Sequence, residues 1–311
     1  MVFCGTPQFA APSLKRLLSE PEFEILGVFT QPDRPKGRGH EVAVSPVKEV
    51  AREAGVAIHQ PEKIRTPENE QLLRELAPDV IVIIAYGQII PGRLLPIPRR
   101  GWINLHASLL PKYRGAAPIA WAIANGESVT GNTTMRIDAG MDTGEILLQQ
   151  ELRIGPEETA PELAARLSEA GAGLMVETLR GLEAGTVRGV AQDHAAASSA
   201  PILRREDGHI DWSRPAQEIY NRMRGFAPWP GAYTEFRGQS CHVWGRPATR
   251  KVISGPPGSL VVERGRVFVA CGAATVLEIL HVKLEGRKQV SAAEFANGAR
   301  VKVGEGLGGS G

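Results

Sequence analysis

The chain has 311 residues, of which 42% are hydrophobic and 23% are charged, and its formal net charge is +2. This length predicts two domains, because soluble domains usually contain about 100–200 residues. The ordinary composition excludes an intrinsically disordered chain, a collagen-like repeat and a small disulfide scaffold.

The first half of the chain alternates short apolar runs with amphipathic segments. Strands are expected at Met1–Cys4, Phe23–Thr30, Val80–Ala85 and Trp102–His106. Helices are expected at Phe9–Leu18, Ser45–Ala54 and Asn69–Leu76. Ser45 is a good N-cap and Pro46 suits the first helical position. This alternation predicts an α/β domain, a Rossmann-like, doubly wound parallel sheet.

The pattern changes in the middle of the chain. A strand pair is expected at Asn132–Ile137 and Glu145–Leu152, followed by a helix over Pro161–Leu182 that Gly181 and Gly185 end. Gly189–Ala200 is rich in small residues, a composition typical of a linker. We therefore predict a first domain over residues 1–188, a linker over 189–203 and a second domain over 204–311.

The second domain contains short apolar runs separated by turn residues. Strands are expected at Ile210–Trp212, Ala232–Phe236, Cys241–Trp244, Ser259–Glu263, Val267–Ala270 and Val276–Val282, with a helical turn at Ile219–Met223. Several short strands in about 100 residues predict a small β-barrel. Trp229, between two prolines, is interpreted as a packing anchor.

The charge is unevenly distributed between the two halves. Residues 1–203 carry 20 Lys and Arg against 24 Asp and Glu, net −4, whereas residues 204–311 carry 16 against 10, net +6. A basic second domain favours a polyanionic partner, and a solvated surface without a partner is the alternative.

The spacing of the cysteines and histidines and the length of the apolar runs exclude several further classes of protein. Cys4, Cys241 and Cys271 are an odd number without paired spacing, which predicts neither a disulfide framework nor a zinc knuckle and favours a reducing, cytoplasmic setting. The seven scattered histidines suggest no metal site. Val80–Ala85 is far shorter than the roughly 20 residues of a membrane helix, and no signal peptide is apparent. The first strand is not followed by the glycines of a dinucleotide site, and Walker A and nucleophile-elbow motifs are missing.

Side chains suited to carbonyl chemistry lie at the end of the strand expected over Trp102–His106. Asn104 and His106 lie two residues apart on an extended backbone, so their side chains share one face. The amide can stabilise an oxyanion and the imidazole can move a proton near neutral pH. Asp142, between Gly140 and Gly144, could orient the imidazole. A strand-end histidine and an ordinary turn are the structural alternatives.

A second candidate region is basic. Residues 30–40 hold three fixed positive charges, at Arg34, Lys36 and Arg38, which could grip a phosphate backbone. A solvated loop is the alternative.

These residues together resemble the 10-formyltetrahydrofolate-dependent formyltransferases. The Asn104-x-His106 pair, Ser108–Pro111 and Asp142 carry the resemblance to the superfamily. Further segments resemble the members that act on methionyl initiator tRNA: Gly5–Pro7, the loop over residues 30–39, Ala85–Gly87, Ile90-Pro91, Tyr113–Pro118 and Phe226–Tyr233. The match runs in order along nearly the whole chain.

The resemblance implies a role for each matching position. Asn104, His106 and Asp142 would be catalytic. The folate co-substrate would be held by Ser108, Leu109, Leu110 and Pro111 together with Tyr86, Gly87, Gln88, Ile89 and Ile90. Arg34, Lys36 and Arg38 would meet the acceptor end of the tRNA, and an OB-like second domain would bind the tRNA body.

The expected reaction is transfer of the formyl group from 10-formyltetrahydrofolate to the α-amino group of methionyl initiator tRNA. Its product, N-formylmethionyl-tRNA, is used in translation initiation. The expected enzyme is a cytoplasmic monomer without a metal or a membrane partner. A sugar-nucleotide amine formyltransferase is the nearest rival, but it generally lacks the basic loop and tends to have Arg where Ala116 stands here. A glycinamide ribonucleotide formyltransferase leaves residues 204–311 unexplained, and a non-catalytic RNA-binding protein leaves the three catalytic side chains unexplained.

Overall fold

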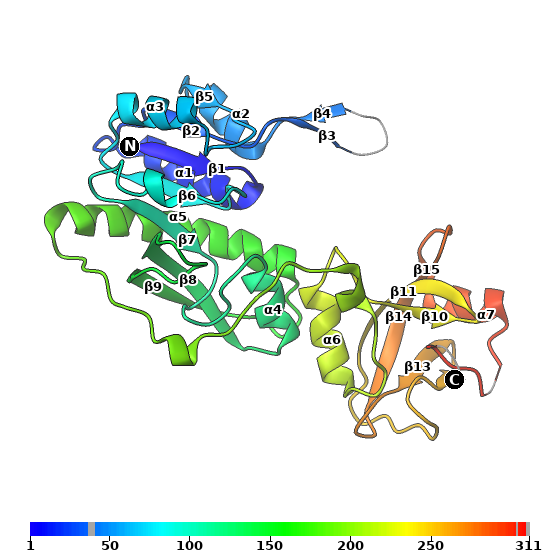
Figure 1. The fold of residues 1–311 in the computed structure, drawn as a ribbon. Coiled ribbons are helices and arrows are strands. Elements are labelled where there is room, and N and C mark those ends of the chain that lie inside the picture. Colours follow the sequence, from blue (N-terminus) through cyan, green and yellow to red (C-terminus); the bar gives the residue numbers. More distant parts are fainter. Residues whose placement is uncertain (37–40, 303, 309–311) are drawn as a thin grey trace. The chain divides into compact units, whose positions relative to one another are not determined.

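The computed structural model describes residues 1–36, 41–302 and 304–308, which separate into two units (Figure 1). The first unit comprises residues 1–118, 129–153 and 162–201. The second comprises residues 119–128, 154–161 and the chain from residue 202 onward.

A seven-stranded sheet in the order β5-β2-β1-β6-β7-β8-β9 organises the first unit. The strands are β1 (Val2–Gly5), β2 (Gly27–Phe29), β5 (Ile58–His59), β6 (Ile81–Ile84), β7 (Trp102–His106), β8 (Val129–Arg136) and β9 (Ile146–Arg153). The first five strands of that order are parallel, whereas β8 pairs antiparallel with both β7 and β9. The predicted Rossmann-like sheet is therefore confirmed, with an antiparallel edge.

Helices cover both faces of this sheet, as a doubly wound fold requires. One face packs Phe3, Val82 and Leu105 against α1 (Ala11–Ser19), α2 (Pro46–Glu53) and α5 (Ala160–Ala184). The other face packs Cys4, Ile83 and Trp102 against Ile64 and against Leu73 of α3 (Pro67–Leu76). Strand residues are buried on both sides, which explains the nearly continuous apolar runs in the sequence.

Helix starts follow the local signals in the sequence. The hydroxyl of Ser45 accepts a hydrogen bond from the amide of Lys48 at 3.1 Å, and Pro46 is the first residue of α2. Thr66 caps α3 in the same way, with Pro67 next. That helix therefore begins two residues before the predicted Asn69.

Two expectations for the first unit need correction. The strand expected over residues 23–30 is reduced to Gly27–Phe29, because β1 pairs from Val2, directly opposite Gly27. Gly181 does not end α5, which continues to Ala184; a Cβ atom on Gly181 would lie 2.3 Å from Cγ2 of Val187. Gly181 thus allows a close approach, and Gly185 with φ +70° follows the helix as predicted.

The second unit is built on an antiparallel sheet in the order β10-β11-β14-β13-β12, with β15 on β14. Its strands are β10 (Tyr233–Phe236), β11 (Gln239–Pro247), β12 (Leu260–Glu263), β13 (Arg266–Ala270), β14 (Val276–Leu284) and β15 (Val290–Ser291). Its core also includes residues of α6 (Ala216–Gly225) and α7 (Ala292–Ala299). Most of α4 (Pro118–Ala124) belongs to this unit as well. The sheet agrees with the predicted small barrel.

The strand expected at Ile210–Trp212 is wrong. Ile210 donates one backbone hydrogen bond to the carbonyl of Tyr233, and the chain then turns. The carboxylate of Asp211 accepts from both the amide and the hydroxyl of Ser213, at 3.0 and 2.5 Å, which stabilises that turn. The predicted helical turn at 219–223 is the central part of α6.

Candidate active site

The end of β7 presents Asn104 and His106 on one face of the central sheet. The residues between and beside them, Ile103 and Leu105, are buried in the core that includes α5. The alternation of side chains along β7 therefore directs Asn104 and His106 to the opposite face. His106 is only 6% exposed, and Asn104 is half-buried. The Asn104 amide makes no hydrogen bond with the described part of the chain, so its N–H groups are available to a ligand.

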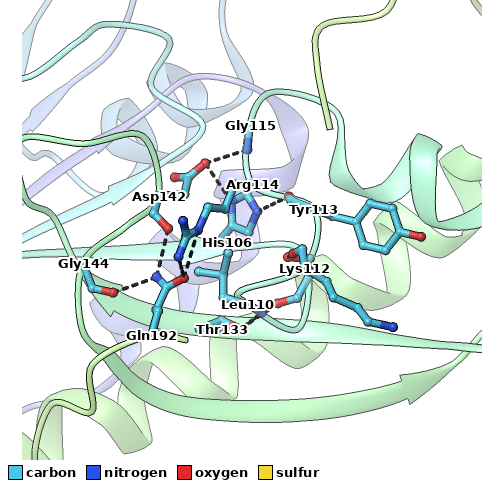
Figure 2. A network of polar contacts seen from close by, with 11 residues as sticks. His106, Leu110, Lys112, Tyr113, Arg114, Gly115, Thr133, Asp142, Gly144 and Gln192 are labelled. Carbon is cyan, nitrogen blue, oxygen red and sulfur yellow. Dashed lines mark hydrogen bonds and ion pairs between the residues drawn. The ribbon is translucent and has the colours of Figure 1, made fainter. Parts of the chain in front are cut away.

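The imidazole of His106 is held between a carbonyl and a carboxylate (Figure 2). Its Nε2 lies 2.9 Å from the carbonyl oxygen of Tyr113. A carbonyl can only accept, so Nε2 carries a proton and donates it. Its Nδ1 lies 3.7 Å from Oδ2 of Asp142. The structure thus brings together His106 and Asp142, which are 36 residues apart in the sequence.

Asp142 belongs to a tightly bonded turn. Its Oδ2 accepts a hydrogen bond from the amide of Gly115 at 2.8 Å, and its own φ is +53°. The earlier Asp138 accepts from the Gly140 amide and the Thr143 hydroxyl, at 3.0 and 2.7 Å. A Cβ atom on Gly144 would lie 1.9 Å from the carbonyl oxygen of Arg136, so only glycine fits there. The turn is therefore built to hold a non-glycine residue in a left-handed conformation.

The sequence did not predict the side chains that fix this turn by hydrogen bonds. Nε2 of Gln192 donates to the carbonyl oxygens of Asp142 and Gly144, at 2.9 and 2.7 Å. Its Oε1 accepts from Nε and Nη2 of Arg114, at 3.1 and 2.6 Å. Gln192 is 6% exposed although it lies in a segment of small residues. The only signal in the sequence was a single amide side chain within that segment.

The segment 108–111 is fixed by two side chains from the antiparallel edge of the sheet. The hydroxyl of Thr133 donates to the carbonyl of Ser108 at 2.6 Å and accepts from the amide of Leu110 at 3.1 Å. Nε2 of Gln149 donates to the carbonyl of Leu110 at 2.9 Å. The Ser108 hydroxyl itself is directed to the carbonyl of Lys112 at 2.6 Å. The folate-binding role of Ser108, Leu109, Leu110 and Pro111 stays a prediction.

The segment 86–90 follows β6 and contains residues in very different settings. Tyr86 is buried, and burial raises the pKa of its phenol. Its carbonyl accepts from the Gln31 amide side chain at 3.1 Å. The side chain of Gln88 is bonded to the backbone of Ile64 and Pro61, at 2.6 and 3.0 Å. Ile89, by contrast, is 90% exposed. Ile89 is thus free to cover a ligand, whereas the side chain of Gln88 is occupied.

A cavity of about 540 Å³ opens at the carboxyl ends of β1, β2 and β6. Its lining includes Thr6, Gln31, Arg34, Ser45, Tyr86 and Gly87. Asn104, His106 and Asp142 are not among the lining residues. This position is the usual one for a ligand in an open α/β sheet.

The basic loop begins as a hairpin. β3 (Arg34–Lys36) pairs antiparallel with β4 (Glu41–Ala43). Asp33, at its base, is paired with Lys48 and accepts from Gln60 at 3.0 Å, and these contacts lower the pKa of its carboxyl group. Arg34 is exposed. Arg38, the third predicted tRNA contact, lies outside the described residues.

The described residues offer no site for a metal ion and no membrane-spanning helix. No group of three or more His, Cys, Asp or Glu side chains there could hold a metal ion. No helix in that part of the chain combines the length and the apolar character needed to cross a membrane.

Comparison with known proteins shows which family the chain belongs to. Residues 1–179 match the profile described as formyl transferase, and residues 202–300 match that of the formyl transferase C-terminal domain. The methionyl-tRNA formyltransferase of Solibacter usitatus is 51% identical over 309 residues, which are 99% of this chain and 98% of that protein. The protein of the same name from Acidobacterium capsulatum is 53% identical over 96% of both chains.

Solved structures show a related fold. An N-formyltransferase from Helicobacter canadensis, in complex with folinic acid and dTDP-3-aminofucose, has a TM-score of 0.67 and covers 89% of this chain and 97% of its own, at 18% identity. A sugar 3N-formyl transferase has a TM-score of 0.64, also at 18% identity, and covers 92% of this chain and 98% of its own. The two profile matches, and the identity of 51% and 53% to these relatives over nearly the whole chain, show that the chain belongs to the methionyl-tRNA formyltransferase family.

Proposed function

We propose that Asn104, His106 and Asp142 catalyse the formyl transfer for which this family is named. The chain transfers the formyl group of 10-formyltetrahydrofolate to the α-amino group of methionyl initiator tRNA. The observation that carries the residue assignment is the environment of His106. Its ring is held by Tyr113 on one side and faces Asp142 on the other, beside an Asn104 amide that is open to a ligand.

Asn104 stabilises the developing negative charge in this proposal. When the amine attacks the formyl carbon, the carbonyl oxygen gains charge, and the amide N–H of Asn104 donates to it. An amide is suited to this role because it carries no charge and is already oriented by β7. Removal of one such donor typically lowers kcat by about 10²–10³-fold.

His106 and Asp142 accept the proton that the attacking amine loses. They return it to N10 of the folate as the bond between N10 and the formyl carbon breaks and tetrahydrofolate leaves. Nε2 of His106 is bonded to the Tyr113 carbonyl, so the atom left for proton transfer is Nδ1, on the side of Asp142 Oδ2. The carboxylate orients the ring and stabilises its positive charge. The Gly115 amide fixes the carboxylate in that position.

We assign the folate co-substrate to the segments 108–111 and 86–90. Both follow strands of the central sheet, β7 and β6, which are neighbours. Ordered backbone in the first segment and the exposed Ile89 in the second supply polar and apolar contacts for a flat ring. Residues 1–188 would form the catalytic domain, 189–203 the connection, and 204–311 the domain that binds the tRNA body.

An aromatic surface on the second unit supports a tRNA contact. Four rings follow one another: His209, which bridges to the start of β10, then Tyr233 of β10, and His242 and Trp244 of β11, with successive centroids 5.5, 5.9 and 6.2 Å apart. The guanidinium of Arg205 lies 5.7 Å from the centroid of Tyr233, and Trp244 is 39% exposed. Rings interleaved with cations are typical of surfaces on which RNA bases stack.

The structure also distinguishes buried arginines of the second unit from exposed ones. Arg224 is buried and donates to the carbonyls of Gly155 and Glu158, at 3.1 and 2.9 Å. Arg246 and Arg266 are more than half exposed, although both contact Glu278. Trp229 is 57% exposed, so its interpretation as a packing anchor is wrong. We assign phosphate contacts in this unit to Arg205, Arg246 and Arg266, and contacts with the acceptor end to Arg34, Lys36 and Arg38. The proposed enzyme is a cytoplasmic monomer.

A formylation assay tests the function. The purified protein is incubated with 10-formyltetrahydrofolate and methionyl initiator tRNA, and formyl-methionine is measured on the tRNA. We expect product with the natural protein and loss of product with His106→Ala. If an amino-sugar nucleotide were formylated and the tRNA were not, the proposed acceptor would be wrong, although formyl transfer from the folate would still be the reaction.

A further inference from the structure

Residues 192–200, called the strap below, are hydrogen-bonded to the segment 111–117. The amide of Arg114 donates to the carbonyl of Ser198 at 2.8 Å, and the amide of Ala200 donates back to the carbonyl of Arg114 at 2.7 Å. The amide of Ala117 donates to the carbonyl of Ala200 at 3.1 Å, and the amide of Tyr113 donates to the hydroxyl of Ser198 at 2.9 Å. The strap therefore pairs like a short parallel strand with this segment.

The segment 111–117 holds both members of the His106–Asp142 pair. The Tyr113 carbonyl accepts from Nε2 of His106, and the Gly115 amide donates to Oδ2 of Asp142. These two backbone groups flank Arg114, whose own backbone is bonded to the strap on both its N–H and its C=O. A shift of the strap would thus move the partners of the imidazole and of the carboxylate together.

Gly115 permits this close pairing. Its φ is +119°, and a Cβ atom at this position would lie 2.7 Å from the carbonyl oxygen of Ala200. A larger residue would push the strap away from the segment that carries the two bonds.

Gln192 connects the Asp142 turn to Arg114, as Figure 2 shows. Its two amide protons serve the carbonyls of Asp142 and Gly144, and its oxygen accepts twice from the guanidinium of Arg114. Every hydrogen-bonding position of the side chain is therefore occupied. One buried amide joins the turn that carries Asp142 to the residue between the two backbone partners.

We propose that Gln192 is a positioning residue that, together with the strap, sets the distance between His106 and Asp142. This inference rests on the proposed function, because it assigns to Gln192 an effect on the same catalytic pair. Gln192 acts through Asp142, whose backbone carbonyl accepts its hydrogen bond. A misplacement of about 1 Å in such a site can lower the rate by about 100-fold.

The test compares Gln192→Glu with the natural protein. The substitution keeps the size of the side chain and its acceptor for Arg114, but it places a carboxylate oxygen against the two carbonyls. We expect kcat for tRNA formylation to fall by about 10- to 100-fold while both KM values stay within about threefold. An unchanged kcat, or a loss confined to KM, would overturn the proposal.

Repeating the comparison in an Asp142→Asn protein distinguishes a positioning role of Gln192 from a general loss of structure. If Gln192 acts through Asp142, Gln192→Glu will change the rate by less than about twofold when Asp142→Asn is already present, because interacting residues are not additive. Single-turnover rates with enzyme in excess make the weaker variants measurable. Equal losses in both backgrounds would overturn the proposal.

Hydrogen exchange gives a readout that is independent of turnover. We expect faster exchange of the peptides covering residues 111–117 and 138–146 in Gln192→Glu, with unchanged exchange in α3. Ser198→Ala, which removes only the acceptor for the Tyr113 amide, should speed exchange in 111–117 alone. Unchanged exchange in both segments would overturn the proposal even if Gln192→Glu were inactive.

Gln71→Glu is the matched control, because it makes the same chemical change at an exposed side chain of α3, outside the strap and outside the proposed site. It should leave kcat and exchange in both segments unchanged, and a loss equal to that of Gln192→Glu would count against a specific role for Gln192. A natural protein that formylates no tRNA would overturn the proposed function itself. An active natural protein with an equally active Gln192→Glu would overturn this inference alone.

Discussion

The catalytic assignment depends on single atoms and on their direction. Asn104 has an amide open to ligand, whereas each nitrogen of His106 faces a defined oxygen. The role of each residue can therefore be tested by substitutions that change hydrogen bonding and preserve volume.

Asn104→Asp is such a substitution. It replaces the donating N–H of the side chain by an oxygen of similar size, so the stabilisation of the oxyanion is lost. We expect kcat to fall by about 10²–10³-fold. Steady-state formylation measures the loss, and thermal unfolding checks that the fold is kept. An Asn104→Asp protein with normal turnover would remove Asn104 from the catalytic set.

Gly144→Ala tests the turn that carries Asp142. The added Cβ atom would lie 1.9 Å from a backbone oxygen, so the chain must move. We expect the free energy of unfolding to fall by about 1–3 kcal/mol, together with a loss of activity. The control is Gly173→Ala in α5, where a Cβ atom meets nothing within 4 Å. Denaturant titration should show a gain of up to about 1 kcal/mol for Gly173→Ala, since alanine favours a helix over glycine.

At the scale of elements, strands are tied together by side chains as well as by backbone. Glu278 of β14 is only 8% exposed in its side chain and contacts Arg266 of β13 at 2.7 Å and Arg246 of β11 at 3.2 Å. The two guanidinium groups, Arg266 first, lower the pKa of this carboxyl group. Three adjacent strands are therefore joined through one ionised side chain.

The stability contributed by this group depends on pH. A carboxyl group whose pKa is lower in the folded than in the unfolded chain stabilises the fold above the unfolded value, which is about 4.3 for Glu. That contribution is lost as the pH falls through the folded pKa. We expect the stability difference between the natural protein and Glu278→Gln to be largest near about pH 7 and to shrink towards about pH 3. Urea titrations across this range measure it, and a difference independent of pH would contradict the interpretation.

At the scale of the whole molecule, the two halves of the chain carry opposite net charge. The net +6 of residues 204–311 is not a uniform surface, because Arg224 is buried and Arg222 donates to the carbonyl of Asp207. Arg205 lies beside the Tyr233 ring of β10, whereas Arg246 and Arg266 are exposed on β11 and β13. Binding of tRNA should accordingly combine counterion release with stacking.

Salt dependence measures the first of these contributions. We expect the association constant for tRNA to fall steeply between about 50 and about 200 mM salt. Arg246→Gln or Arg266→Gln should each reduce the log–log slope by about 1. Arg16→Gln, in an exposed ion pair of α1, serves as the control and should leave the slope unchanged. A slope that no variant in the second unit alters would place the phosphate contacts elsewhere.

Local sequence patterns determined many of the strands and helix starts of this protein. β7 spans Trp102–His106 as predicted, Ser45 and Pro46 start α2, and the alternation of strands and helices specifies the doubly wound sheet. These features depend on residues within one or two turns or on the two-residue period of a strand, so they can be read along the chain. The same period places Asn104 and His106 on one face.

Only the tertiary structure decided what holds those side chains in place. Gly115 and Asp142 are 27 residues apart, and Tyr113 and Ser198 are 85 apart, so their hydrogen bonds leave no local pattern. A segment of Ala, Ser and Gly indicates a linker by composition, yet its backbone groups pair with residues 111–117 because buried N–H and C=O groups require partners. The sequence by itself therefore determined the fold and suggested the three side chains that we propose as catalytic, and hydrogen bonds to the backbone of the segment 111–117 determined the geometry of His106 and Asp142.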